Sequence, residues 1–355
     1  SCNSSDLDPV LDLGETPISD HLLDKHDQNY VDDKVPLEIV FCSECGLVHL
    51  TRSVDPDWMF DERYPYFSSV TNGLLEHSAR NASELIERLN LDSSSLVIEI
   101  ASNDGYMLKN FHNQNIPVLG IDPASRQTVL AQEQGIRTLT KFFDLDLAQS
   151  LSDEGDKADL IIANNVLAHV PQLNNFVAGV AKLLADDGIA SIEVPYVKDM
   201  VDHMEFDTIY HQHLCYFSVT ALNNLFRRHR LFINDLRRLP IHGGSLRLFV
   251  GKHHQPSQIL SELLQQEDDE GITRLHYFQD FALRVATKRH DLIQLLTKLK
   301  KQNCRIAAYG AAAKGNTLLS YCGIDKKLVD YVVDINQHKQ GKFMGGNSLP
   351  IVPVE

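Results

Sequence analysis

The segment at residues 203–218, HMEFDTIYHQHLCYFS, concentrates side chains that can take part in acid–base chemistry, with three histidines and two tyrosines in sixteen residues. Histidine is suited to remove a proton near neutral pH, and tyrosine or histidine can donate a hydrogen bond to a developing oxyanion. A solvated loop does not need so many of these groups, and an apolar core would exclude most of them. The segment therefore predicts a catalytic site supplied by Tyr210, His211, His213 and Tyr216.

Two other interpretations of this segment stay open at this point. It could be a surface segment whose imidazoles are satisfied by ordinary hydrogen bonds, or it could bind a metal ion. His211 and His213 are two residues apart, so their side chains would diverge on a helix and converge only on a strand or in a turn.

A second group of candidate residues lies at 99–105, EIASNDG, at the end of the apolar run 96–100. Small residues in this turn let the backbone approach a ligand at the start of the following helix. Glu99 and Asp104 add negative charge, which fits a cationic ligand that bears an amino acid better than it fits a pyrophosphate. The G-x-G-x-x-G pattern of a dinucleotide site is missing.

Asp122 ends the next apolar run, where it can bind two ribose hydroxyls, and FFD follows at 142–144 at a suitable interval. This arrangement predicts S-adenosylmethionine as the cofactor. The alternative is an ordinary turn with acidic caps. The predicted cofactor-binding residues are Glu99, Ala101, Asn103, Asp104, Gly105, Asp122 and Asn164.

The elements that must position these residues alternate between strands and helices. Apolar runs at 96–100, 118–124, 158–170 and 188–197 predict strands, and amphipathic stretches between them predict helices. This alternation predicts an α/β fold with a doubly wound parallel sheet. A long amphipathic helical region then follows at 258–302.

Three cysteines near the start of the chain have the spacing of a structural zinc site. Cys42 and Cys45 form a Cys-x2-Cys knuckle that puts two thiolates on one tight turn, and Cys2 is a third candidate ligand. The fourth ligand could be His49, or a cysteine before Ser1 if the natural chain starts earlier. The alternative is a pair of buried cysteines whose spacing arose by chance.

The second half of the chain repeats a strand–glycine turn–helix pattern in YGAAAKGNTLL at 309–319. Lys314 and Asn316 in this turn are suited to hold a phosphate, although a tightly packed turn with a solvated lysine is the alternative. Tyr196 in EVPY, and His242 and Arg247 in IHGGSLRLFV, are further candidate substrate-binding residues on a strand entrance. The chain stops where another strand–helix unit is expected, so we expect this half to be truncated.

Composition narrows the functional classes. The chain has 355 residues and a net charge of −15, and it lacks the clustered Lys and Arg that nucleic acid binding requires. It contains no run of about 18 apolar residues that would predict a membrane span, and no signal-peptide pattern at its start. Six cysteines in a chain of this length predict reduced thiols and a cytoplasmic enzyme.

Five motifs occur in an order that resembles the sugar C-methyltransferases acting on nucleotide-linked deoxysugars: IEIASNDGYML, NNVLAHVPQL, EVPY, EFDTIYHQHLCYFS and AAYGAAAKGNTLL. The resemblance covers nearly the whole chain. It implies a zinc-binding module at 1–70, an S-adenosylmethionine-binding domain at 71–255, and a helical linker with a truncated Rossmann-like half at 256–355. In the same terms, Cys2, Cys42 and Cys45 match three of the four zinc ligands of the family.

The resemblance also implies roles for individual residues. Tyr210 and His213 match the catalytic tyrosine and histidine of the family's Tyr-His-Glu-His motif, with His213 as the base. His169 is implied to lie near the sulfonium of the cofactor. One tyrosine of YPYFSS is implied to belong to the site, and we favour Tyr64 over Tyr66.

We therefore expect an S-adenosylmethionine-dependent C-methyltransferase of a dTDP-linked keto-deoxysugar, in which a base removes the proton α to the carbonyl group and the carbanion takes the methyl group. Gln212, also in the catalytic segment, stands where the family has glutamate, so turnover could be slow or altered in substrate. The alternatives are an O- or N-methyltransferase of a small molecule and a cofactor-binding protein with impaired catalysis. The expected partner is the small-molecule substrate, without nucleic acid or membrane, and the protein is expected to be a monomer or a homodimer.

Overall fold

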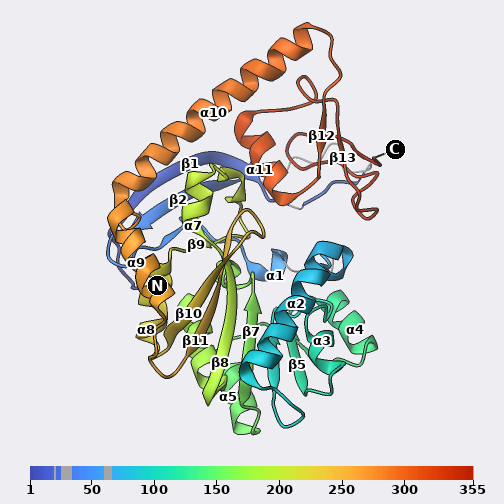
Figure 1. Cartoon of the computed structure of the whole chain (residues 1–355). Coiled ribbons are helices and arrows are strands. Elements are labelled where there is room, and N and C mark those ends of the chain that lie inside the picture. Colours follow the sequence, from blue (N-terminus) through green and yellow to red (C-terminus); the bar gives the residue numbers. More distant parts are fainter. Residues whose placement is uncertain (20, 25–33, 60–65, 355) are drawn as a thin grey trace. The chain divides into compact units, whose positions relative to one another are not determined.

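The computed structural model describes residues 1–19, 21–24, 34–59 and 66–354, and the chain divides into two compact units (Figure 1). Unit 1 consists of Ser1–Asn3, Asp55–Tyr196 and Val219–Asp269. Unit 2 consists of Ser4–Val54, Val197–Ser218 and Glu270–Glu355. The division into three domains at residues 70 and 255 remains a prediction.

Unit 1 is built on a seven-stranded sheet with the order β10-β11-β8-β7-β4-β5-β6. The strands from β8 to β6 pair in parallel, whereas β10 pairs with β11, and β11 with β8, in antiparallel register. The predicted α/β fold with a central parallel sheet is confirmed. The antiparallel hairpin at the edge of the sheet is not predicted, because β11 is buried at every residue, as the parallel strands β4 and β5 are. The strands are β4 (Val97–Ile100), β5 (Val118–Asp122), β6 (Thr138–Thr140), β7 (Ala158–Asn164), β8 (Leu184–Pro195), β10 (Phe232–Leu239) and β11 (Ser245–Gly251).

Helices α2, α3 and α4 pack on the sheet through a shared apolar core. Leu85 of α2, Phe111 of α3 and Ala131 of α4 are fully buried there together with Val97 and Leu160 of the sheet. Their burial is the main source of stability of this unit. The helices are α1 (Pro56–Met59), α2 (Asn72–Leu89), α3 (Leu108–His112), α4 (Ser125–Glu133), α5 (Leu145–Asp153), α6 (Leu173–Leu183), α8 (Val219–Arg228) and α9 (Gln258–Glu270).

Two central strands contain acidic residues although they are buried throughout. β4 has the sequence VIEI and β5 has the sequence VLGID, and every residue of both strands is buried, as expected of parallel strands that are covered on both faces. Glu99 and Asp122 are therefore inside the protein, where a carboxylate is costly unless it gains partners. The fold thus places two charged groups at the carboxyl ends of neighbouring strands.

Unit 2 contains two smaller sheets. An antiparallel sheet has the order β1-β2-β3-β9, with β1 (Leu7–Pro17), β2 (Lys34–Cys42), β3 (Val48–Leu50) and β9 (Cys215–Tyr216). A parallel sheet has the order β12-β13-β14, with β12 (Ala307–Tyr309), β13 (Tyr331–Val333) and β14 (Ile351–Val352). The helices of the unit are α7 (Val197–Asp202), α10 (Leu275–Lys301) and α11 (Ala313–Cys322).

The longest helix is α10, with 27 residues, and it confirms the amphipathic helix predicted in this region. Charged residues occur along its whole length, and Lys298, Lys300 and Lys301 lie in its last turn, where cations interact favourably with the helix dipole. Within the described ranges, no helix is both long enough and apolar enough to cross a membrane.

Gly120 on β5 lies in close contact with the turn that follows β4. A Cβ atom at this position would be 2.5 Å from Ser102 Oγ and 3.0 Å from Thr138 Oγ1. We expect Gly120→Ala to lower the free energy of unfolding by about 1–3 kcal/mol, because overpacking forces the neighbouring backbone and side chains to move. Chemical denaturation measures the effect. In the control Gly73→Ala on α2, the new Cβ would meet no atom within 4 Å, so unchanged or increased stability is expected. Equal stability of the two variants would contradict the close contact.

Candidate active site

The turn after β4 has a left-handed backbone at alternating positions. The φ angles are +60° at Ala101, +49° at Asn103 and +78° at Gly105. Asn and Gly tolerate this region, whereas it is strained for Ala, and strain of this kind is concentrated at functional sites. The sequence predicts these residues as a cofactor turn but does not reveal the backbone, because two of the three are not glycine. The turn follows the carboxyl end of β4, where open α/β sheets bind ligands.

Asp122 ties this turn to the next strand. Its Oδ2 accepts a hydrogen bond from the N–H of Asn103 at 2.9 Å, and its Oδ1 accepts one from the N–H of Ala124 at 2.8 Å. Burial raises the pKa of the Asp122 carboxyl, and the two N–H donors act in the opposite direction. The structure thus brings Asp122 to the predicted cofactor turn, and its oxygens keep lone pairs that can accept hydrogen bonds from a ligand.

Glu99 is a buried acid of the site whose carboxyl group lacks hydrogen-bond partners within the described residues. It is 1% exposed, and neither carboxylate oxygen has a hydrogen-bond partner among the described residues. Burial raises the pKa of Glu99 well above its ordinary value, and the carboxylates of Asp122, Asp104 and Glu193 raise it further. Within the same described residues, Ser102 Oγ and one oxygen of Asp104 are also buried without a partner. Unpartnered acceptors and clustered carboxylates fit a cofactor that carries an ammonium and a sulfonium group.

The segment before α2 packs on the same turn. The N–H of Ser68 donates to Asn103 Oδ1 at 2.9 Å, and the N–H of Ser69 donates to Asp104 Oδ2 at 3.2 Å. The carbonyl oxygen of Tyr66 accepts a hydrogen bond from Asn103 Nδ2 at 3.4 Å. Sequence reasoning misses Ser68 and Ser69, because they contribute through the backbone and their side-chain types carry no signal.

The predicted residues Asn164 and His169 lie at the carboxyl end of β7 and just after it. Oδ1 of Asn164 is buried, as is Oδ1 of Asn165, and both lack a hydrogen-bond partner in the part of the chain that the structure describes. A short 3₁₀ turn carries the half-buried His169 at the same end of the strand.

The two candidate tyrosines of YPYFSS precede α2. Tyr64 lies outside the described residues, and Tyr66 is 47% exposed.

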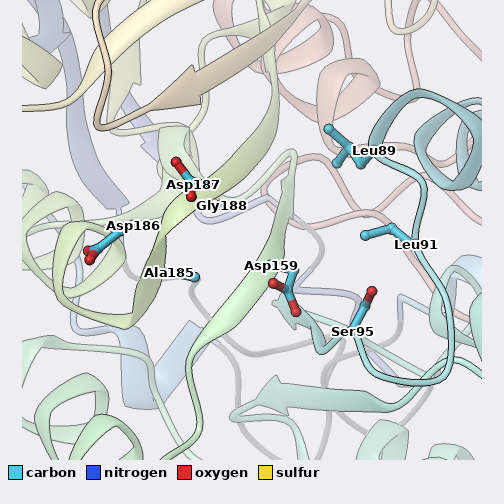
Figure 2. A pocket seen from close by; sticks show the side chains of 8 residues that line it. All are labelled: Leu89, Leu91, Ser95, Asp159, Ala185, Asp186, Asp187 and Gly188. Atoms are coloured by element: carbon cyan, nitrogen blue, oxygen red, sulfur yellow. The ribbon is translucent and has the colours of Figure 1, made fainter.

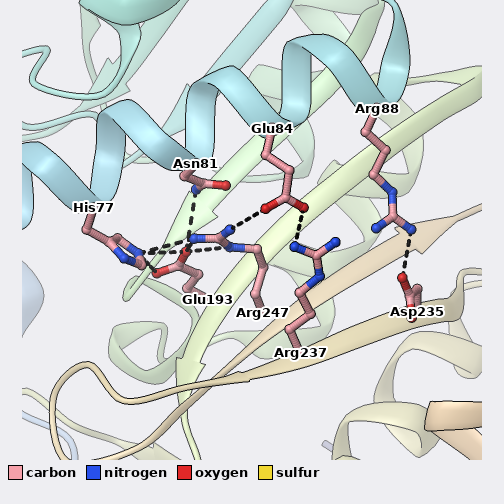
Figure 3. Close-up of polar contacts among 8 residues, drawn as sticks. All are labelled: His77, Asn81, Glu84, Arg88, Glu193, Asp235, Arg237 and Arg247. Atoms are coloured by element: carbon pink, nitrogen blue, oxygen red, sulfur yellow. Dashed lines mark hydrogen bonds and ion pairs between the residues drawn. The ribbon is translucent and has the colours of Figure 1, made fainter.

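Figure 3 shows a network of charged side chains between α2 and the strands β8, β10 and β11. Glu193 on β8 accepts a hydrogen bond from Nε of Arg247 at 2.7 Å, and both its oxygens are 3.1 Å from His77 Nε2. Burial acts to raise the pKa of Glu193, but His77 and Arg247 lower it overall. Arg247, a predicted substrate-binding residue, is 4% exposed and held by Glu193. Its contact with substrate remains a prediction.

Tyr196 and His242 are the other predicted substrate-binding residues of unit 1. Tyr196 is 1% exposed, and its hydroxyl donates to Glu267 Oε1 at 2.8 Å. Glu267 also accepts hydrogen bonds from the N–H groups of Val219 and Thr220, so it caps the start of α8. His242 lies in the turn between β10 and β11 with a φ of +57°. Their roles toward a substrate remain predictions, and Tyr196 also has a structural partner.

In unit 2, Tyr210 and His213 form a hydrogen-bonded pair. The hydroxyl of Tyr210 is 2.7 Å from His213 Nε2, and His213 Nδ1 is 3.0 Å from the carbonyl oxygen of Thr208. Because a carbonyl oxygen can only accept, Nδ1 carries the proton, and Nε2 of the neutral imidazole accepts the hydrogen bond from Tyr210. Both side chains are half-buried, so the pair is suited to exchange a proton with a ligand.

The residues beside this pair are buried. His211 is 1% exposed, its Nε2 donates to the Val35 carbonyl oxygen at 3.2 Å, and burial lowers its pKa. Its predicted part in catalysis remains a prediction. Gln212 is 6% exposed and Tyr216 is 4% exposed. Within the residues described, His211 and His213 are not part of a cluster of metal-binding groups, which gives the metal-binding interpretation no support.

The predicted phosphate-binding turn lies at the start of α11. It follows β12 through Gly310, whose φ is +92°. Lys314 Nζ is 3.4 Å from Glu205 Oε2. Asn316 is 2% exposed, and its Oδ1 has no hydrogen-bond partner within the described part of the chain. The structure therefore gives the start of α11 a cation and, within the described residues, an unpartnered amide oxygen.

The three predicted zinc ligands come together. The sulfur atoms of Cys2, Cys42 and Cys45 lie within 4.8 Å of one another, and Cys42 and Cys45 are buried. Three thiolates this close together could hold one zinc ion, which prefers sulfur ligands in tetrahedral sites. Within the described residues, His49 is not part of this cluster. Its Nδ1 donates to the carbonyl oxygen of Leu50 at 2.8 Å.

A surface pocket, shown in Figure 2, lies away from these residues. Asp159 is near the amino end of β7, whereas the cofactor turn follows the carboxyl end of β4. Asp186 and Asp187 are almost fully exposed and pair with Lys252 and His253. None of the predicted site residues lines this pocket, which is formed by Leu89, Leu91, Ser95, Asp159, Ala185, Asp186, Asp187 and Gly188.

Three known families match successive parts of the chain. Residues 1–60 match a putative zinc binding domain, residues 74–231 match a methyltransferase domain, and residues 240–355 match a C-methyltransferase C-terminal domain. The first match contains Cys2, Cys42 and Cys45, and the second contains Glu99 and Asp122. The zinc-binding and methyltransferase parts predicted from the sequence are thereby confirmed.

Individual relatives were found among sequences and among solved structures. Magnesium protoporphyrin IX methyltransferase from Synechocystis PCC 6803 is 16% identical with a TM-score of 0.42, over 51% of this chain and 84% of that one. A ubiquinone biosynthesis O-methyltransferase from Bartonella quintana is 27% identical over 26% of this chain and 38% of its own. C-methyltransferase NovU from Streptomyces niveus is 31% identical over 353 residues, which are 99% of this chain and 84% of that protein. From this full-length likeness and the matching domains, the chain belongs to the S-adenosylmethionine-dependent C-methyltransferases.

Proposed function

We propose that this C-methyltransferase acts on a nucleotide-linked keto-deoxysugar, such as a dTDP-sugar, and methylates the carbon next to the carbonyl group. The observation that carries the proposal is the hydrogen-bonded pair of Tyr210 and His213. A C–H bond next to a carbonyl becomes nucleophilic only when a base removes its proton. An amine is already nucleophilic, so a pair of this kind favours carbon over nitrogen as the acceptor.

The orientation of His213 suggests how the proton moves. The Tyr210 oxygen takes the α-proton of the sugar while its own proton passes to His213 Nε2, which leaves a neutral phenol, an imidazolium ion and an enolate. The Thr208 carbonyl, which accepts from Nδ1, stabilises the imidazolium ion. His213 is then the final proton acceptor, as expected for the base, and Tyr210 is the group that contacts the substrate. We assign His169 to the enolate oxygen as a hydrogen-bond donor.

Unit 1 supplies the residues for the methyl donor. When bound there, S-adenosylmethionine would supply a methyl group activated by its sulfonium, whose thioether is a neutral leaving group. We assign Glu99 to the ammonium group and Asp122 to the ribose hydroxyls. The unpartnered side-chain oxygens of Asn164, Ser102 and Asp104 can provide further polar contacts. The three cysteines hold zinc in a structural role, apart from the chemistry.

The start of α11 suits the diphosphate of the substrate. Helix N-terminal N–H groups and a lysine are a common combination for binding phosphate. Lys314 would exchange its partner Glu205 for a phosphate oxygen, and the unpartnered Oδ1 of Asn316 can accept from a hydroxyl of the ligand. In a protein with a net charge of −15, a local cation of this kind is needed to bind an anionic substrate.

Removal of the Tyr210 hydroxyl tests the proton transfer directly. We expect Tyr210→Phe to slow solvent deuterium incorporation at the α-carbon of a dTDP-4-keto-deoxysugar, and to lower kcat for methyl transfer, each by a factor of about 100 or more. Mass spectrometry of the sugar in the presence of S-adenosylhomocysteine measures the exchange without methylation. His213→Asn should have the same effect.

The matched control is Tyr277→Phe, which removes a hydroxyl that bonds Asp202 at 2.9 Å in the same unit. It should leave exchange and kcat unchanged within a factor of about two. Exchange at the wild-type rate in both Tyr210→Phe and His213→Asn would rule out this pair as the base.

Glu99 predicts a pH dependence of cofactor binding. Its pKa is raised in the free protein, and a bound cation favours the ionised form, so affinity should be full above the raised pKa and fall as the pH drops through it. We expect binding of S-adenosylhomocysteine to release a proton in the pH range just below that pKa. Isothermal titration calorimetry in two buffers of different ionisation enthalpy measures the release.

Glu99→Gln should bind about tenfold more weakly above the raised pKa, since it loses a charge-assisted hydrogen bond, and its affinity should not change with pH over this range. Asp235→Asn, which removes a carboxylate paired with Arg88 in the same unit, is the control and should behave as the wild type. A pH dependence that persists in Glu99→Gln would assign the proton to another group.

Substitution of Gln212 distinguishes two hypotheses, an active enzyme and a cofactor-binding protein with impaired catalysis. We expect the wild type to turn over, and Gln212→Glu to change kcat by less than about tenfold, because the Thr208 carbonyl already orients His213. Turnover of a panel of dTDP-keto-sugars by both proteins measures this. An inactive wild type that gains activity in Gln212→Glu would favour impaired catalysis instead.

A further inference from the structure

Helix α11 presents one face to the segment that leads into Tyr210. Lys314, Thr317 and Tyr321 are spaced i, i+3 and i+7, so they lie on one stripe of the helix. Lys314 Nζ is 3.4 Å from Glu205 Oε2. The ring of Tyr321 meets that of Phe206 in an edge-to-face arrangement, with centroids 5.5 Å apart.

The contact of Thr317 is the one nearest to the proposed acid–base pair. Its hydroxyl donates to the carbonyl oxygen of Ile209 at 2.9 Å, and Thr317 and Ile209 are 2% and 0% exposed. The Ile209 carbonyl and the Tyr210 N–H belong to one rigid peptide plane. Fixing the carbonyl therefore fixes the backbone from which the Tyr210 side chain extends.

The same stretch of backbone also orients His213. The carbonyl oxygen of Thr208 is bound to His213 Nδ1 at 3.0 Å, and that of Tyr210 accepts from the His213 N–H at 2.8 Å. The successive peptide groups that follow Thr208 and Ile209 therefore link the acid–base pair to α11. A rotation at Ile209 would change both the position of the phenol and the acceptor that sets the imidazole tautomer.

We propose that Thr317 is a positioning residue for the Tyr210–His213 pair, acting through the peptide group that joins Ile209 to Tyr210. The inference rests on the function proposed for that pair and adds a physical link to the substrate. α11 begins with the turn assigned to the diphosphate, so the helix that receives the anionic end of the substrate also orients the groups that take its proton.

Thr317 carries this role in preference to Lys314. The Lys314–Glu205 pair is 35% and 26% exposed at its side chains, and ion pairs in contact with water contribute little. The hydroxyl of Thr317 is buried, and a buried carbonyl that loses its donor cannot regain one from water without local rearrangement.

Thr317→Val keeps the shape of the side chain and removes the donor, and Thr317→Ser keeps the donor. We expect Thr317→Val to lower kcat and the rate of deuterium exchange at the α-carbon about tenfold, the size of effect produced by losing one buried hydrogen bond, with KM for S-adenosylmethionine unchanged. Thr317→Ser should restore both rates to within about twofold of the wild type. Thr287→Val, on the exposed surface of α10, removes a hydroxyl bonded to Leu283 and is the control for loss of a helical hydroxyl.

A measurement on the free protein keeps the test independent of the reaction. ¹⁵N NMR of labelled histidines, with the His213 signals assigned by their absence in His213→Asn, reports which ring nitrogen carries the proton. The wild type and Thr317→Ser should show protonated Nδ1, and Thr317→Val should show a mixture of the two tautomers. Thermal unfolding checks that all variants are folded.

The outcomes separate the two ideas. Unchanged tautomer and unchanged rates in Thr317→Val would overturn the positioning role, and so would a defect that Thr317→Ser does not correct. If the wild type exchanged no proton of any keto-sugar while Thr317→Val still altered the tautomer, the proposed substrate would be wrong and the positioning role would stand.

Discussion

The unpartnered carboxylate of Glu99 is the constraint around which unit 1 is arranged. Two neighbouring carboxylates are already compensated inside the protein, Asp122 by two backbone N–H groups and Glu193 by Arg247 and His77. Glu99 alone sits at 1% exposure with both oxygens unpaired within the described residues. Leaving the carboxyl group of Glu99 without hydrogen bonds lowers the stability of the fold. Ionisable groups in such unfavourable surroundings are characteristic of binding sites. The arrangement favours a ligand that brings the missing positive charge.

The backbone of the turn after β4 is held by hydrogen bonds. Ala101, Asn103 and Gly105 have left-handed conformations, and their N–H groups bond within the protein to Ile121, Asp122 and Ser102. These contacts have to offset the strain at Ala101. Asp122 binds the turn from the side of β5, and Ser69 binds it at Asp104 from the segment before α2. The turn that we propose to bind the cofactor and the packing of unit 1 therefore depend on the same few hydrogen bonds.

Much of this arrangement could be predicted from the sequence, because it is local. Apolar runs with an acid at or next to their carboxyl end predict β4 and β5, and the carboxyl ends of adjacent parallel strands necessarily meet at one edge of the sheet. The pattern of residues alone therefore places Glu99 and Asp122 together. The Cys-x2-Cys knuckle predicts the place of Cys42 and Cys45 for the same reason, since a tight turn fixes its own geometry.

Contacts between segments far apart in the chain could not be predicted. The sequence predicts Arg247 as a substrate-binding residue, but the antiparallel register of β11 with β8 sets it directly opposite Glu193. That register depends on an edge hairpin that the apolar pattern does not distinguish from a parallel strand. The bond from Thr317 to Ile209 spans 108 residues, and neither residue type signals it.

The orientation of His213 helps to explain why this chain can have Gln212 where the family has glutamate. A catalytic histidine needs a second group that fixes which nitrogen carries the proton, and a carboxylate is the usual choice. Here the Thr208 carbonyl fills that position, so Nε2 faces the Tyr210 hydroxyl without help from residue 212. A glutamate at this buried position would bring a charge that the tautomer does not require and that burial makes expensive. Glutamine at 212 is therefore compatible with a working acid–base pair, which favours an active enzyme over a protein that only binds the cofactor.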